Sequence, residues 1–273
     1  MLTFPTAKIN IGLQVTERRP DGYHNLDTVF YPIPVNDALE VIVAEGANYD
    51  CRLHISGIHI EGDTDNNLVV RAYRLLAADY TLPSVDIYLH KHIPTGAGLG
   101  GGSADASYML RLLNEMFSLG ITTEKLEAYA TQLGADCPFF ITGRPVYATG
   151  IGNEFHPIAL DLSGWHLVVV KPDVFVSTKE AYSMVRPEKP AVTLDEKITR
   201  PITEWKDTIS NDFERGIFAL HPELSDIKEK LYTLGATYAA MSGSGSALFG
   251  LFEAPIEDVE QHFPGCFCEQ QKL

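Results

Sequence analysis

The stretch Pro94-Thr-Gly-Ala-Gly-Leu-Gly-Gly-Gly-Ser-Ala-Asp-Ala-Ser107 decides how this chain is interpreted, because it places five glycines within seven residues and then a serine. Glycine allows positive φ and lets backbone N–H groups approach a ligand without a Cβ in the way. A helix that begins here adds unsatisfied N–H donors and the positive end of its dipole. The stretch therefore predicts a loop that binds a nucleotide polyphosphate. The alternative interpretation is a flexible glycine linker.

The residues on either side of the glycines favour a strand–loop–helix unit. Residues 84–90 alternate polar and apolar side chains, which is the period of a half-buried strand. After the glycines, apolar side chains recur at helical spacing as far as Gly120, at Ala106, Met109, Leu110, Leu113 and Phe117. Ser103 is the expected N-cap or first-turn hydroxyl of this helix. A linker rarely joins such a strand to an amphipathic helix, so phosphate binding is favoured.

Several types of glycine-rich phosphate loop can be compared with this stretch. A P-loop requires a lysine after the glycines, and none follows here. The dinucleotide pattern G-x-G-x-x-G is met by Gly96, Gly98 and Gly101, but the acid at about the right distance, Glu115, falls inside the predicted helix and not at a strand end. A protein-kinase glycine loop requires the tripeptides H-R-D and D-F-G, and the sequence contains neither.

Composition restricts the possible partners and the compartment. Acidic residues outnumber basic residues 36 to 21, which gives a net charge of −15. Such a field repels nucleic acid, anionic lipid and nucleotide alike, so we expect no nucleic-acid partner, no membrane contact and local capture of any phosphate. The four cysteines show neither zinc-ligand spacing nor a disulfide framework. With no signal-peptide pattern and no long apolar run, we expect a cytoplasmic protein.

Patterning along the whole chain predicts strands interleaved with helices, the α+β class. Strands are expected at residues 6–15, 28–33, 38–44, 52–60, 84–90, 146–149, 166–171, near 237, at 247–252 and at the end of the chain. Besides the helix after the glycines, helices are expected at residues 67–80, 123–133, 178–185, within 205–219, at 223–234 and at 256–263. Gly, Pro and Asn cluster between residues 152 and 165, so we predict two domains, 1–155 and 156–273.

The pattern P-x-x-x-G-L-G followed by small residues, from Pro94 to Ala104, resembles the GHMP kinases, the family of galactokinase, homoserine kinase and mevalonate kinase. Gly101 and Gly102 stand where most of the family has serines, which is similar to one branch that phosphorylates a cytidine-diphosphate-linked methylerythritol in non-mevalonate isoprenoid synthesis. Other segments resemble this branch in the same order over nearly the whole chain: Pro5-Thr-Ala-Lys-Ile-Asn10, Arg19-Pro-Asp-Gly-Tyr-His24, Asn67-Leu-Val-Val-Arg-Ala72, Leu133-Gly-Ala-Asp-Cys-Pro-Phe139, Ser210-Asn-Asp-Phe213 and Met241-Ser-Gly-Ser-Gly245.

The resemblance implies a two-domain GHMP-kinase fold, with an N-terminal domain like ribosomal protein S5 and a ferredoxin-like C-terminal domain. It also implies ATP as co-substrate, with Mg²⁺, and a small-molecule acceptor; we expect a monomer or weak homodimer. ATP would be held by Asn67, Leu68, Pro94, Gly96, Ala97, Gly98, Leu99, Gly100, Gly101, Gly102, Ser103 and Ala104. Ser103 is the best protein ligand for the metal, and the acidic metal partner of other family members has no counterpart that can be placed.

Two residues match the catalytic positions of the family. Lys8 shares a strand face with Asn10, two residues away, and spacing alone would allow it to be a solvated surface charge. The resemblance gives it the role of holding the acceptor hydroxyl and keeping a carboxylate ionised. Asp136 could be an ordinary cap of a short helix opened by Cys137-Pro138. The resemblance makes it the general base that deprotonates the attacking alcohol.

The resemblance also assigns acceptor-binding residues. Tyr23 would stack on the cytosine, His24 would hydrogen-bond to its edge and Tyr182 would close the stack, although they could also be a hairpin tip and a core aromatic. Asn10, Ser244 and Gly245 complete the expected acceptor site, while residues 241–246 could simply be a tight strand connection. The rival functions are another GHMP small-molecule kinase, a non-catalytic nucleotide-binding homologue, and an oxidoreductase that uses the G-x-G-x-x-G pattern.

Overall fold

The structure is a computed structural model that describes residues 1–60 and 62–273. These residues form two compact units, each built from several stretches of the chain. Unit 1 comprises Met1–Ala7, Val35–Thr95 and Gly100–Arg144, and unit 2 comprises Lys8–Pro34, Gly96–Leu99 and Pro145–Leu273. The domain boundary predicted between residues 155 and 156 stays a prediction.

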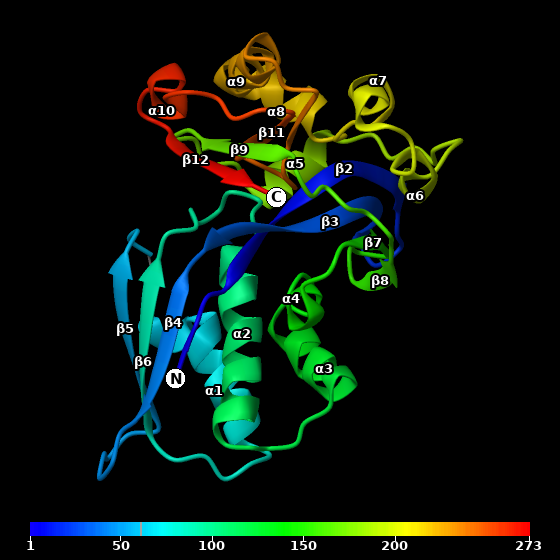
Figure 1. Cartoon of the computed structure of the whole chain (residues 1–273). Coiled ribbons are helices and arrows are strands. Elements are labelled where there is room, and N and C mark those ends of the chain that lie inside the picture. The colour runs from blue at the N-terminus through cyan, green and yellow to red at the C-terminus, as the bar shows by residue number, and fades with distance from the viewer. Residues whose placement is uncertain (61) are drawn as a thin grey trace. The chain divides into compact units, whose positions relative to one another are not determined.

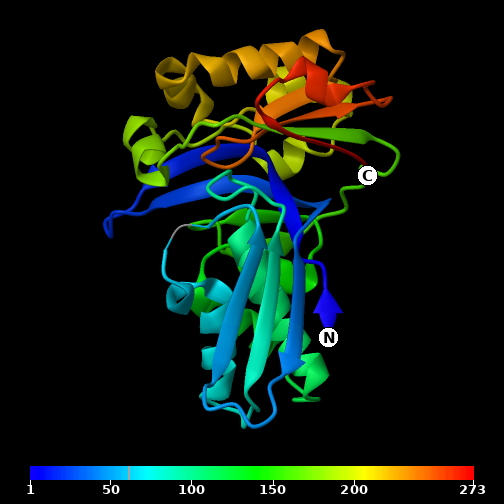
Figure 2. The same ribbon diagram turned by 90° about the vertical axis from the view of Figure 1, so that its left-hand side faces the viewer.

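Unit 1 is a four-stranded sheet with helices on one face. The strand order is β1 (Leu2–Thr3), β4 (Ala38–Val43), β6 (Val85–Lys91) and β5 (Cys51–Gly57). β4 runs antiparallel to β1 and β6, whereas β5 is parallel to β6. The helical segments are η1 (Thr64–Asn66), α1 (Leu68–Ala77), α2 (Gly101–Met116), α3 (Thr123–Leu133) and α4 (Phe139–Thr142). In Figures 1 and 2, α1 and α2 lie against the same face of this sheet.

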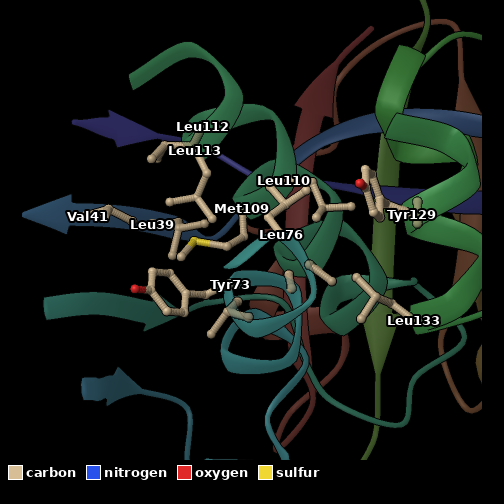
Figure 3. Packing of buried hydrophobic residues seen from close by; sticks show 14 of the residues in the cluster. Leu39, Val41, Tyr73, Leu76, Met109, Leu110, Leu112, Leu113, Tyr129 and Leu133 are labelled. Carbon is tan, nitrogen blue, oxygen red and sulfur yellow. The ribbon is translucent and has the colours of Figure 1, made fainter. Parts of the chain in front are cut away.

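The core of unit 1 forms where the apolar faces of these elements meet. Figure 3 shows Leu39 and Val41 of β4 facing Met109 of α2, with Tyr73 of α1 beside them. On β6 the buried side chains alternate, as expected for a strand with one face on the core. The glycine-rich stretch therefore follows β6 and continues into α2, and the strand and the helix both pack into the same core.

Unit 2 contains two further four-stranded sheets. One has the order β2 (Thr6–Arg18), β3 (His24–Asn36), β7 (Val146–Thr149) and β8 (Glu154–Pro157). The first two residues of β2 and the last two residues of β3 belong to unit 1. The other has the order β10 (Tyr238–Met241), β11 (Leu248–Phe252), β9 (His166–Lys171) and β12 (Phe267–Lys272), with all its neighbouring strands antiparallel.

Helices accompany the second of these sheets. They are α5 (Thr178–Met184), α6 (Leu194–Lys197), η2 (Ile202–Glu204), α7 (Trp205–Thr208), α8 (Glu214–Leu220), α9 (Pro222–Thr233) and α10 (Val259–His262). α9 and α10 lie over one face of this sheet in Figure 1. Leu224 and Leu231 of α9 pack into a core that includes Val168 and Leu248 from the strands. No helix in the described part of the chain is long and apolar enough to cross a lipid bilayer.

The predicted α+β class is confirmed, and the predicted elements are found with shifts of a few residues at their ends. The structure decides between the two positions expected for Ser103, the N-cap of α2 and its first turn. Ser103 is not the N-cap of α2, because Gly100, with φ of +73°, holds that position and Ser103 is the third residue of the helix. The left-handed conformation at Gly100 suits glycine, and it turns the chain into the helix without a side-chain cap. Ser103 therefore lies in the first turn of α2, the second of its two expected positions.

Candidate active site

Lys8 is a buried lysine on β2, with only 3% of its surface exposed. Its Nζ donates to the Oδ1 of Asn10 at 2.5 Å and to the carbonyl oxygen of Gly98 at 2.7 Å. The same Nζ lies 5.0 Å from the centre of the Phe30 ring. A buried ammonium requires such partners, because removing it from water is costly. Lys8 is therefore not the solvated surface charge that strand position alone would allow.

Gly98 is the point where the glycine-rich loop packs against the segment that follows β10. Its φ is +76°, and a Cβ added there would lie 2.0 Å from the carbonyl oxygen of Ser242. The Gly98 carbonyl also accepts a hydrogen bond from the Ser242 hydroxyl at 2.9 Å, and this hydroxyl accepts from the backbone N–H of Asn10 at 3.1 Å. Only glycine fits this contact, so the loop position is fixed by tertiary packing as well as by local conformation.

The segment after β10 is itself held by Asn211, a buried residue of the Ser210-Asn-Asp-Phe213 motif. The Nδ2 of Asn211 donates to the carbonyl oxygens of Met241 and Gly243, both at 2.8 Å. Ser244 lies beyond it, with its hydroxyl 3.3 Å from that of Thr178, and Gly245 adopts a φ of +87°. Ser244 and Gly245, two of the predicted acceptor-binding residues, thus lie on a turn of unit 2 that Asn211 holds in place.

The expected cytosine-binding aromatics lie on the β2–β3 turn and on α5. The rings of His24 and Tyr182 stack with centres 5.0 Å apart and 21° between their planes. Tyr182 is half-buried and meets Phe213 edge-on at 4.9 Å, whereas Tyr23 is 62% exposed. Burial, followed by the charge of Arg18, lowers the pKa of His24. A neutral imidazole has one donor and one acceptor nitrogen, which suits the edge of a nucleobase.

In unit 1, a buried ion-pair cluster holds both ends of the glycine-rich segment. Lys91, the last residue of β6, pairs with Asp37 and with Asp105 of α2, the latter at 2.7 Å. Asp37 also accepts the backbone N–H groups of His92 and Ile93, the two residues before Pro94, at 2.6 and 2.8 Å. Burial raises the pKa of Asp105 to about 7, although Lys91 acts in the opposite direction.

The first turn of α2 lies next to the start of α1. A Cβ added to Gly101 would meet the Ile93 side chain at 2.9 Å and the Nζ of Lys91 at 3.3 Å. A Cβ added to Gly102 would lie 3.7 Å from the Leu68 side chain, a distance of ordinary van der Waals contact. Asn67 uses its Oδ1 to accept the N–H of Val69 at 3.0 Å, so its side chain caps α1. The nucleotide-binding residues predicted near 67 and 102 are therefore brought together.

Asp136 is half-buried in the turn between α3 and α4. This turn is joined to α2 by the hydroxyl of Ser107, which donates to the carbonyl oxygen of Cys137 at 2.6 Å. Burial raises the pKa of Cys137 to about 11, so its thiol stays protonated near neutral pH. Pro138 holds the N-cap position of α4, and Asp136 lies two residues before it. Both interpretations of Asp136, as a cap of the turn and as the general base, stay predictions.

Two family models match the chain. The GHMP kinases N terminal domain covers residues 67–144, and the GHMP kinases C terminal domain covers residues 199–267. The chain belongs to the GHMP kinase family. The resemblance first suggested by the residues around Gly98 and Gly101 is thereby confirmed, together with the two-domain GHMP-kinase fold.

This GHMP kinase is similar over its full length to curated proteins. It is 56% identical to a 4-diphosphocytidyl-2-C-methyl-D-erythritol kinase of Bacteroides fragilis, with all of both chains aligned. It is 52% identical to the protein of the same name from Parabacteroides distasonis, again with all of both chains aligned. A crystal structure of 4-(cytidine 5'-diphospho)-2C-methyl-D-erythritol kinase matches with a TM-score of 0.84 and 35% identity, covering 99% of this chain and 98% of the other.

Sequence reasoning missed several polar residues that support the site of this GHMP kinase. They are Thr28, Asp37, Lys91, Asp105, Asn211 and Ser242, all buried. Asn211 and Ser242 lie within quoted motifs, so the motifs carried a usable signal for them. Asp37, Lys91 and Asp105 carry charges in apolar surroundings, and charges are rarely buried without partners. Their partners are 14 and 54 residues apart in sequence, so no local pattern connects them.

Proposed function

We propose that this GHMP kinase transfers the γ-phosphoryl group of ATP to the 2-hydroxyl of 4-diphosphocytidyl-2-C-methyl-D-erythritol, a step in non-mevalonate isoprenoid precursor synthesis. The observation that carries the proposal is the full-length 56% identity to a kinase named for this acceptor. The aligned region covers all of this chain, so it includes both units. The geometry of three separate groups of residues supports it.

The glycine-rich loop supports ATP as phosphoryl donor. At Gly98 and Gly101 a Cβ would come within 3 Å of other protein atoms, so close packing fixes the backbone of the loop. The N-terminus of α2 directs its first N–H groups and its dipole toward the loop, an arrangement that favours phosphate. Below Gly101, Lys91 and its partners Asp37 and Asp105 hold the start of α2 in place.

Lys8 and Asp136 are the proposed catalytic residues. In phosphoryl transfer the protein mainly positions the reactants and stabilises charge, while a carboxylate accepts the proton of the attacking hydroxyl. Asp136 would take this proton, and the Lys8 ammonium would hold the acceptor oxygen in line. The fixed hydrogen bonds of Lys8 to Asn10 and Gly98 support a positioning function.

The aromatic group supports recognition of a cytidine. A half-buried Tyr182, a neutral His24 stacked on it and an exposed Tyr23 two residues after Asp21 offer flat surfaces and a donor–acceptor edge. Stacking on aromatic side chains and hydrogen bonds to the base edge are general means of reading an unpaired base. This combination would serve no purpose for homoserine or mevalonate, which have no ring.

Mg²⁺ is implied by the chemistry, because the charge of the β- and γ-phosphates must be neutralised. Among residues 1–60 and 62–273, no three His, Cys, Asp or Glu side chains cluster to hold a metal ion. We infer that Mg²⁺ is bound chiefly by phosphate oxygens and water, as is usual for that ion, and we propose the hydroxyl of Ser103 as a protein ligand. The metal would supply charge neutralisation, and the binding of the acceptor and the proton transfer would belong to the protein.

The test is a purified-protein assay of ADP release from ATP with three acceptors. We expect turnover with the cytidylyl polyol, and none above background with homoserine or mevalonate. Loss of turnover in a Lys8→Met variant that still binds ATP shows that the measured activity belongs to the proposed site. Equal rates with mevalonate, or no rate with the cytidylyl polyol, would contradict the proposal. Binding of ATP without turnover of any acceptor would instead indicate a non-catalytic homologue.

A further inference from the structure

We propose that Thr28 is a positioning residue that fixes the orientation of the Asn10 side-chain amide, and so presents a carbonyl oxygen to Lys8. The inference rests on the proposed function, because its consequence is measured in phosphoryl transfer. Thr28 lies on β3 and is completely buried. No motif in the sequence marks it.

A chain of hydrogen bonds joins Thr28 to Lys8 within unit 2. The Thr28 hydroxyl donates to the carbonyl oxygen of Gly12 at 2.6 Å. The Nδ2 of Asn10 donates to the Oγ1 of Thr28 at 2.9 Å. At the other side of the amide, the Nζ of Lys8 donates to the Oδ1 of Asn10 at 2.5 Å. Each group in this chain is joined to the next by one direct contact.

A count of protons shows that the amide has only one allowed orientation. A hydroxyl has a single proton, and the Gly12 carbonyl can only accept, so that proton must point to Gly12. The Oγ1 of Thr28 can then only accept from Asn10, which places the NH₂ group of the amide at Thr28 and its oxygen at Lys8. The reversed amide would set two oxygens against each other and an NH₂ group against an ammonium. Thr28 thus transmits the polarity of a backbone carbonyl to Lys8.

The surroundings leave this chain without a substitute for the hydroxyl. Lys8, Asn10 and Thr28 are 3%, 2% and 0% exposed, so water has little access to the amide. The second acceptor of Lys8, the carbonyl of Gly98, is held in place by the hydroxyl of Ser242 at 2.9 Å. Ser242 thus fixes one acceptor of the ammonium, and Thr28 fixes another. Misdirection of a group that holds the acceptor oxygen lowers kcat more than it weakens ATP binding.

The experiment compares two substitutions at Thr28 with one control. Thr28→Val keeps the shape but removes the hydroxyl, and Thr28→Ser keeps the hydroxyl. Thr16→Val is the matched control, because the Thr16 hydroxyl bonds to the carbonyl of Asn25 at 3.3 Å in the same β2–β3 hairpin, outside this chain of bonds. We expect Thr28→Val to lower kcat by about 10- to 100-fold with the KM for ATP changed by no more than about twofold. Thr28→Ser and Thr16→Val should stay within about threefold of the unmodified protein in kcat.

A double-mutant cycle separates amide orientation from a general packing defect. Asn10→Asp replaces the amide by two oxygens, so no orientation has to be chosen. The single Thr28 proton cannot serve both the carboxylate and the Gly12 carbonyl, so one oxygen–oxygen contact of Thr28 is left without a proton. Adding Thr28→Val removes that repulsion. The valine substitution should therefore lower kcat and the free energy of unfolding in the presence of Asn10, and leave both unchanged or higher in the presence of Asn10→Asp. The unfolding measurement gives this answer even where Asn10→Asp is inactive.

Three results would overturn the inference. They are a Thr28→Val kcat within about threefold of the Thr16→Val control, an equal loss in Thr28→Ser, and equal valine effects in both Asn10 backgrounds. Failure of the proposed function is recognised separately, since the unmodified protein would then not phosphorylate the cytidylyl polyol. In that case the unfolding measurements of the cycle still decide whether Thr28 orients the amide.

Discussion

Gly98→Ala is expected to destabilise unit 2 strongly and to impair the loop, although it adds a single methyl group. An added Cβ would lie 2.0 Å from the carbonyl oxygen of Ser242 and 2.9 Å from its carbonyl carbon, and both are backbone atoms. A side chain could rotate away from such a contact, but a backbone segment must move as a whole. The residue also has φ of +76°, a conformation that L-residues other than glycine rarely adopt.

The magnitude follows from the bonds that the movement breaks. Left-handed backbone at a non-glycine residue costs about 1–2 kcal/mol. Moving the loop away from Ser242 separates the Gly98 carbonyl from the Ser242 hydroxyl and from the Lys8 ammonium. A neutral hydrogen bond contributes about 0.5–1.5 kcal/mol and one to a charged group about 1.5–3 kcal/mol. The free energy of unfolding should therefore fall by about 3 kcal/mol or more in Gly98→Ala.

Gly102→Ala is the matched control in the same glycine-rich stretch. Gly102 lies inside α2, and a Cβ there would be 3.7 Å from Leu68, an ordinary contact. Replacing glycine by alanine at such a site typically raises the free energy of unfolding by about 0.4–1 kcal/mol, since the unfolded chain loses freedom. The two variants should thus change stability in opposite directions. This contrast distinguishes close packing at Gly98 from a general intolerance of the loop.

The assay is urea unfolding of the ligand-free protein, followed by tryptophan fluorescence for unit 2 and by far-ultraviolet circular dichroism for the helices of unit 1, which contains Gly102. Both tryptophans, Trp165 and Trp205, belong to unit 2, the unit that contains Gly98 and Ser242. Trp205 is 1% exposed, so its emission should change when the unit opens. A Gly98→Ala variant within about 1 kcal/mol of the unmodified protein would refute the reasoning. So would a Gly102→Ala variant that loses as much stability as Gly98→Ala.

Three further predictions concern charge and chemistry. Burial raises the pKa of Asp105 to about 7, so the folded state binds the carboxyl proton more tightly than the unfolded state does. The free energy of unfolding should therefore fall as pH rises from about 4 to 7. Unfolding measured against pH should show a smaller fall in Asp105→Asn. Asp136→Asn should lower kcat by at least about 100-fold with ATP affinity within a few-fold, and an active variant would exclude Asp136 as the base. Tyr23→Ala should raise the KM of the cytidylyl acceptor and spare that of ATP, and equal losses for both would indicate a folding defect instead.

Much of the fold was predictable because the relevant signals are local. The alternation in residues 84–90 gave β6, and the apolar spacing after the glycines gave α2. Thr122 caps α3 with its side chain and Gly134 ends it, close to where the sequence placed these limits. The N-cap of α2 could not be read in the same way, because glycine, serine and asparagine all serve there and the choice depended on the conformation of Gly100.

The candidate site was predictable by motif but not by arrangement. The motifs named Lys8, Asn10, His24 and Tyr182, and the structure gives them partners. The stacking of His24 directly on Tyr182 was not expected, because the sequence suggested that the two tyrosines would face a base between them. Nothing in the spacing of residues 24 and 182 could indicate a contact across that distance.

The sequence by itself determined the local elements, the glycine-rich loop and the family, since periodicity, turn chemistry and ordered motifs are all carried by neighbouring residues. The tertiary structure alone decided which polar groups are buried together. Lys8 bonds to the Gly98 carbonyl and, through Asn10, to Thr28, and Lys91 pairs with Asp37 and Asp105. Burial is a property of the whole fold, because strands from distant parts of the chain must pair before a lysine loses its water. Once that water is lost, each charge or amide needs a specific partner, and this need fixes the geometry of the site.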